Sequence, residues 1–152
     1  MWGFGLFACE NSVVQINPDA YSGLRRHGEE AYPEESCGVL VGKLDGPCVV
    51  SAIRCDNVRR DSLKNRYAID SKELVRIQRE TRERGLEIVG FYHSHPDHTA
   101  EWSSTDLAEA HWIACSYVIT SVESGKAAET RSFRLEGSWD DKRFVEEEIV
   151  LE

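Results

Sequence analysis

The sequence alternates short β-rich apolar runs with amphipathic helical patterns, and this alternation limits the fold more strongly than any other feature. A helix is expected from Pro18 to about residue 32, because Asn17 is a good N-cap and proline suits the first helical position. A second helix is expected to end at Gly85, and a short third one to cover residues 103–112. The alternation predicts an α/β (α+β) fold, in which a mixed, curved β-sheet is flanked by two main helices and one short helix.

Eight segments have the pattern of strands. They are residues 12–16, 35–43, 47–58, 67–70, 87–92, 115–122, 131–135 and 144–150. Asp45-Gly46 between the second and third segments is a strong hairpin signal. The last segment fits a strand or a helix, and we favour a strand because it contains the β-branched residues Val145, Ile149 and Val150.

Length and composition favour one domain over residues 1–152, since 152 residues can bury a sizeable core. The apolar residues 1–10 are expected to be a loose terminus or an edge strand, and residues 151–152 are interpreted as an expression remnant without a role. No apolar run reaches the roughly 18 residues of a membrane span. Five cysteines without a CxxC pair are typical of a reduced, cytoplasmic protein, and a formal net charge of -9 argues against a nucleic-acid partner.

Two histidines follow the apolar segment 87–92 directly, in His93-Ser94-His95-Pro96. Side chains at i and i+2 of an extended chain point to the same face, so both imidazoles can reach one metal ion. A catalytic zinc usually has three protein ligands and a water, and Asp106 offers a carboxylate from the first turn of the next helix. Ser103 lies on the same helix face as Asp106, three residues earlier. These residues predict a site for one zinc ion held by His93, His95 and Asp106.

Simpler explanations exist for each half of this pattern. Ser103 and Asp106 also fit a capping box, with serine as the N-cap and aspartate at the N3 position. A His-x-His pair on a strand is, taken alone, more often structural than metal-binding. The metal interpretation is favoured by the combination of both halves at a fixed spacing, while the capping box stays open as its main rival.

The combination of His-x-His-Pro, seven residues between His95 and Ser103, and two between Ser103 and Asp106 resembles the motif of the JAMM (MPN+) metalloproteases. This family also has an upstream glutamate in the context Pro-x-Glu-x-x-Gly, which falls on Glu35 here. Glu34 is the competitor, but it has the wrong spacing to the glycine and would face the other way in an extended chain. The resemblance covers about residues 12–135 and implies the JAMM/MPN, cytidine-deaminase-like fold.

The resemblance also implies a mechanism and a substrate. It assigns Glu35 as general base for a zinc-activated water, and Ser103 as hydrogen-bond donor to the developing oxyanion. The compact form is similar to the bacterial branch that acts on ubiquitin-like sulfur-carrier proteins of the ThiS/MoaD type, so a peptidase acting at the tail of such a carrier is expected. An isopeptidase acting on true conjugates, a non-catalytic module that binds a ubiquitin-like partner, and a nucleic-acid role remain alternatives, the last disfavoured by charge. The exact substrate and the oligomeric state stay open.

The remaining titratable residues have no assigned role. His98 lies in the loop after Pro96 and is interpreted as a bystander. His27 and His111 are expected in helices. Cys37 and Cys115 are expected to be small buried residues rather than nucleophiles or ligands.

Overall fold

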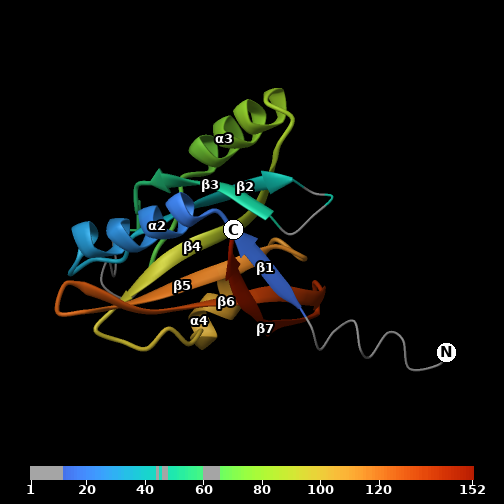
Figure 1. Cartoon of the computed structure of the whole chain (residues 1–152). Helices are drawn as coiled ribbons and strands as arrows, with labels where there is room; N and C mark the ends of the chain where they lie inside the picture. Colours follow the sequence, from blue (N-terminus) through green and yellow to red (C-terminus); the bar gives the residue numbers. More distant parts are fainter. Residues whose placement is uncertain (1–11, 44, 46–47, 60–65) are drawn as a thin grey trace.

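A computed structural model describes residues 12–43, 45, 48–59 and 66–152, and the strands in these residues form one closed barrel (Figure 1). In barrel order the strands are β1 (Val13–Ile16), β3 (Cys48–Cys55), β2 (Cys37–Lys43), β4 (Glu87–Pro96), β5 (Ser116–Glu123), β6 (Lys126–Ser138) and β7 (Asp141–Leu151). The helices are α2 (Pro18–Ala31), α3 (Ser71–Glu83) and α4 (Ser104–Glu109).

The sheet is mixed, as predicted. Strand β1 is parallel to β3 and β7, and β4 is parallel to β5, whereas the other neighbours are antiparallel. The predicted curvature extends to closure, because β1 pairs with β7 and so joins the two ends of the sheet. The short strand β1 pairs with two residues of β3 and four of β7, and so closes the barrel at this end of both strands.

The central strands β2 and β4 are buried on both faces. Phe91 of β4 belongs to the same apolar cluster as Ile77 of α3, whereas its neighbour Tyr92 belongs to the cluster of Leu24 on α2. Burial on both faces explains why these segments are continuously apolar rather than alternating. Because side chains alternate along β4, the histidines continue the Phe91 face and Ser94 continues the Tyr92 face.

The start of α2 follows the predicted capping, and α3 has a cap that was not predicted. The side chain of Asn17 accepts hydrogen bonds from the first turn of α2, and that of Asp70 accepts one from Glu73 N in α3. Gly85 follows the end of α3 with a φ of 77°, the left-handed conformation that glycine tolerates. The strand expected at residues 67–70 is wrong: this segment has no regular structure, and its last residue caps the helix instead.

The last two residues extend the pairing of the barrel, since Leu151 pairs with Ile16 and the Glu152 N–H donates to the Ile16 carbonyl at 3.1 Å. The interpretation of residues 151–152 as an expression remnant stays a prediction. The preference for a strand at the C-terminus is confirmed by β7. The predictions for residues 1–10 and for Gly46 lie outside the described residues. Among the described helices, none has the length and apolar character needed to cross a membrane.

Candidate metal centre

The two histidines of β4 present their Nε2 atoms to each other at the end of the strand. The two nitrogens are 3.2 Å apart, and both side chains are buried, with relative exposures of 2% for His93 and 9% for His95. This proximity follows from their spacing, because i and i+2 share one face of a strand.

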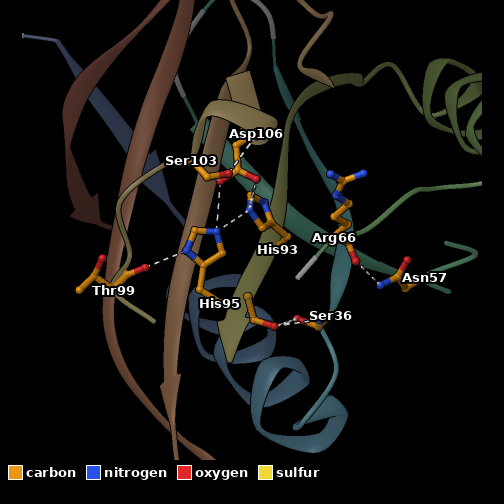
Figure 2. A network of polar contacts seen from close by, with 9 residues as sticks. Ser36, Asn57, Arg66, His93, His95, Thr99, Ser103 and Asp106 are labelled. Atoms are coloured by element: carbon orange, nitrogen blue, oxygen red, sulfur yellow. Dashed lines mark hydrogen bonds and ion pairs between the residues drawn. The ribbon is translucent and has the colours of Figure 1, made fainter. Parts of the chain in front are cut away.

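Asp106 on α4 completes the cluster from above, as Figure 2 shows. Its carboxylate oxygens lie 3.3 Å from His93 Nε2 and 3.1 Å from His95 Nε2. Zn–N bonds of about 2.0–2.1 Å in a tetrahedron place neighbouring ligand atoms about 3.3 Å apart, so all three separations fit one small ion. Among the described residues, these three form a group able to hold a metal.

The other ring nitrogens determine which imidazole atoms can act as ligands. His95 Nδ1 lies 2.7 Å from the carbonyl oxygen of Thr99, so Nδ1 carries the proton and donates it. Nε2 of His95 then presents its lone pair to the cluster, as in metal sites where a backbone carbonyl orients the ligand. His93 Nδ1 is buried without a hydrogen-bond partner in the described residues, and the ring of Tyr67 stacks on His93 with centroids 4.5 Å apart.

The electrostatics of the cluster favour the ligand forms of His93 and Asp106, whereas metal binding at His95 competes with protonation. Burial lowers the pKa of His93, which keeps this imidazole neutral. Burial also lowers the pKa of His95, but its hydrogen bonds with Asp106 and Thr99 outweigh this and raise it overall. The pKa of Asp106 is well below its usual range, because hydrogen bonds with both imidazoles outweigh the effect of burial. Asp106 is therefore a carboxylate at neutral pH.

Ser103 is the N-cap of α4, and the capping box is present together with the cluster. The Ser103 Oγ accepts from Asp106 N at 3.1 Å, and Asp106 Oδ2 accepts from Ser103 N at 2.9 Å. The two interpretations of this segment are thus compatible, since the same carboxylate oxygen accepts from the cap and faces His95. The hydroxyl of Ser103 acts as an acceptor in the cap, so its own proton is available to another group.

Glu35 precedes β2 and is buried, with 5% exposure, whereas its competitor Glu34 is exposed. Its Oε1 atom is buried and has no hydrogen-bond partner in the described residues. Burial, followed by the negative charges of Asp106 and Glu109, raises the pKa of Glu35 to about 9. A buried carboxyl without a partner costs stability, which is typical of a functional group rather than of a structural one.

None of the other candidates belongs to a group able to hold a metal among the described residues. His98 is exposed in its loop, and His27 lies on α2 with Nδ1 2.7 Å from the hydroxyl of Tyr92. The expectation of a helical His111 is wrong, because α4 already ends at Glu109. Cys37 and Cys115 are buried as expected, and burial raises the pKa values of their thiols to about 12 and about 11. Both are therefore inert thiols at neutral pH.

Sequence reasoning missed the residues that support the cluster. Thr99 contributes a backbone carbonyl, which any residue could supply, so no sequence signal marks it. Asn57 lies in residues 56–59 and Tyr67 in residues 66–70, and neither of these described segments has regular structure. Ser94 lies between the two histidines and faces the opposite side of β4, because side chains alternate along a strand. The structure places it against Ser36, beside Glu35.

The chain is similar to proteins of a known family in sequence and in structure. Residues 17–136 match the family described as prokaryotic homologues of the JAB domain. The chain is 30% identical over 146 residues to a desampylase from Haloferax volcanii, covering 93% of this chain and 99% of that relative. It is 29% identical over 123 residues to a CysO-cysteine peptidase from Mycobacterium bovis, covering 81% and 83%. A JAB1/MPN domain protein from Archaeoglobus fulgidus has the same fold, with a TM-score of 0.55 at 15% identity over 90% of this chain and 96% of that one.

Proposed function

The chain belongs to the family of prokaryotic homologues of the JAB domain, and from this premise we propose that it is a zinc-dependent metallopeptidase. Its reaction is hydrolysis of an amide or isopeptide bond at the C-terminal tail of a ubiquitin-like protein, and we favour sulfur carriers of the ThiS/MoaD type. One of the relatives, the CysO-cysteine peptidase, has a name that specifies a peptidase, and the desampylase is similar over nearly its whole length. Both similarities support the proposal that this chain is a hydrolase that acts on a carrier protein.

The observation that carries this proposal is the convergence of three ligand atoms beside a buried carboxyl without a partner. His93, His95 and Asp106 would hold the ion through two imidazole nitrogens and one carboxylate oxygen, and His95, whose pKa is raised, would release a proton on binding. When bound, zinc supplies a Lewis acid that lowers the pKa of a water molecule toward 7 and polarises the scissile carbonyl.

The protein's own groups move and stabilise charge in the reaction. Glu35 accepts the proton of the attacking water and returns it to the leaving amine. This role requires the carboxylate form of Glu35. Burial and acidic neighbours raise the pKa of Glu35 to about 9, and positive charge at the cluster would lower it again. The free hydroxyl proton of Ser103 is donated to the oxyanion that develops on the substrate carbonyl.

The test is incubation of the zinc-loaded protein with carrier proteins that bear a C-terminal extension or an isopeptide-linked partner, followed by intact mass spectrometry. We expect cleavage by the wild type, and loss of cleavage in Glu35→Gln and His93→Ala. The matched control is Glu34→Gln, because Glu34 is the adjacent but exposed glutamate. An active Glu35→Gln variant would remove the case for a peptidase of this type. So would a wild type that binds one zinc per chain yet leaves all these substrates intact.

A further inference from the structure

Within the described part of the chain the carboxylate of Glu35 forms no hydrogen bond, and its Oε1 atom is buried. A carboxylate that accepts no hydrogen bonds cannot be oriented by them, so its direction depends on the main chain from which it projects. Any group that fixes this main chain therefore controls where the proposed base lies.

Ser94 fixes the main chain on the C-terminal side of Glu35 through two hydrogen bonds with the main chain of Ser36. The Ser36 N–H donates to Ser94 Oγ at 2.8 Å, and the Ser94 N–H donates to the Ser36 carbonyl at 3.1 Å. Both serines are buried, with 3% and 1% exposure. The side chain of Ser94 thus replaces a backbone acceptor at the point where the β2–β4 ladder ends, next to the paired residues Cys37 and His93.

The space around Ser94 permits only a small residue. Gly28 of α2 lies directly over it, and a Cβ atom added at Gly28 would be 3.3 Å from Ser94 Cβ. A hydroxyl on a small side chain is what this position can hold while still offering an acceptor to Ser36. The residue between the two histidines is therefore constrained by packing on one side and by hydrogen bonding on the other.

Asn57 fixes the carbonyl side of the same Glu35–Ser36 peptide group. Its Nδ2 donates to the carbonyl of Glu35 at 3.3 Å and to that of Arg66 at 3.0 Å, while its Oδ1 accepts from Ala68 N at 3.0 Å. These bonds tie the Glu35 main chain to the segment containing Tyr67, whose ring stacks on His93. The contacts of Asn57 thus connect the proposed base and the ligand cluster through one side chain.

We propose that Ser94 and Asn57 are positioning residues that hold Glu35 in register with the cluster of His93, His95 and Asp106. The inference rests on the proposed function, because it requires Glu35 to act as the base. A shift of about 1 Å in a catalytic group can cost on the order of 100-fold in rate. Loss of either positioning residue therefore lowers kcat and leaves KM and metal binding nearly unchanged.

The test compares Ser94→Ala and Asn57→Asp with the wild type, all loaded with zinc, on a ThiS/MoaD-type carrier with a C-terminal extension. Asn57→Asp retains an oxygen for the Ala68 N–H but loses the donor to Glu35. The control is Ser132→Ala, which removes an equally buried hydroxyl that bonds to Glu147 outside the cluster. The readouts are kcat, KM, zinc per chain, thermal midpoint, and amide exchange of Ser36 in the metal-free protein.

We expect kcat to fall about 10- to 100-fold in Ser94→Ala and Asn57→Asp, with KM within about twofold and zinc near one per chain. The Ser36 amide should exchange faster in Ser94→Ala, whereas Ser132→Ala should lower the thermal midpoint and retain kcat. If the wild type is active, and both Asn57→Asp and folded Ser94→Ala retain its kcat, the inference is overturned while the proposed function stands. A zinc-loaded wild type without activity overturns the proposed function together with the inference, and the two failures are thereby distinguished.

Discussion

Replacing Ser103 by alanine and Asp106 by asparagine separates the two contacts that meet at one carboxylate oxygen. Asp106 Oδ2 accepts from Ser103 N at 2.9 Å and lies 3.1 Å from His95 Nε2. Ser103→Ala removes the acceptor of the cap and leaves all three proposed ligands. Asp106→Asn leaves an oxygen for the cap but removes the negative charge that would hold the metal.

The expected sizes follow from the contacts. Loss of a serine N-cap costs about 1 kcal/mol, which lowers the thermal midpoint of a chain of this length by about 2–4 °C. Zinc at about 100 times its dissociation constant stabilises the folded state by about 2.7 kcal/mol, which raises the midpoint by about 5–11 °C. Ser103→Ala should therefore start lower and show the full zinc-induced rise, whereas Asp106→Asn should show little rise.

The assay is differential scanning calorimetry of metal-free protein and of the same protein with zinc at a fixed multiple of the wild-type dissociation constant. Isothermal titration calorimetry supplies that constant. A full zinc-induced rise in Asp106→Asn would refute the assignment of Asp106 as a ligand. Ser103→Ala is designed to affect the cap alone. If this variant also lost the zinc-induced rise of the thermal midpoint, the cap and the metal contact of Asp106 would not be separable.

Three further predictions concern pH, packing and metal loss. The pKa of Glu35 is raised on folding, so its carboxyl favours the protonated folded state, and the stability of the metal-free protein falls as pH rises between about 4.5 and about 9. Urea titrations should show a much smaller fall in Glu35→Gln. This variant should be more stable than the wild type by on the order of 3 kcal/mol at pH 7. The same pH dependence in both proteins would contradict the burial of an ionisable Glu35. On α2, Gly23→Ala should stabilise by about 0.5–1 kcal/mol because nothing lies within 4 Å of the added Cβ. Gly28→Ala should gain nothing or destabilise, since its Cβ meets Val122 Cγ2 at 3.0 Å and Ser94 at 3.3 Å, and equal effects in the two variants would count against the close packing of this helix. Chelation should abolish peptidase activity while circular dichroism retains the folded spectrum, because the apolar clusters of the barrel do not include the ligands; unfolding on chelation would make the ion structural instead.

Much of the fold was accessible from local patterns. Asn17-Pro18 marked the start of α2, and Gly85 marked the end of α3, because capping and left-handed turns are properties of a few adjacent residues. The segment 67–70 misled the strand prediction, since an apolar tripeptide before an N-cap has the composition of a strand but no neighbouring strand to pair with. Closure of the barrel had no signal, because it depends on β1 pairing with β7 from the opposite end of the chain.

The alternation of strand and helix patterns was enough to predict the fold class, and the spacing of the His-x-His-Pro motif was enough to predict the proposed ligands. Periodicity and spacing determine which side chains share a face. They could not show that Ser94 binds the main chain of Ser36 or that Asn57 binds the carbonyl of Glu35. Those contacts join residues tens of positions apart, and whether they form depends on which strands pair and on how closely Gly28 lets α2 approach. The capping box and the ligand cluster were rivals in the sequence, and they coexist because one carboxylate has enough lone pairs for both.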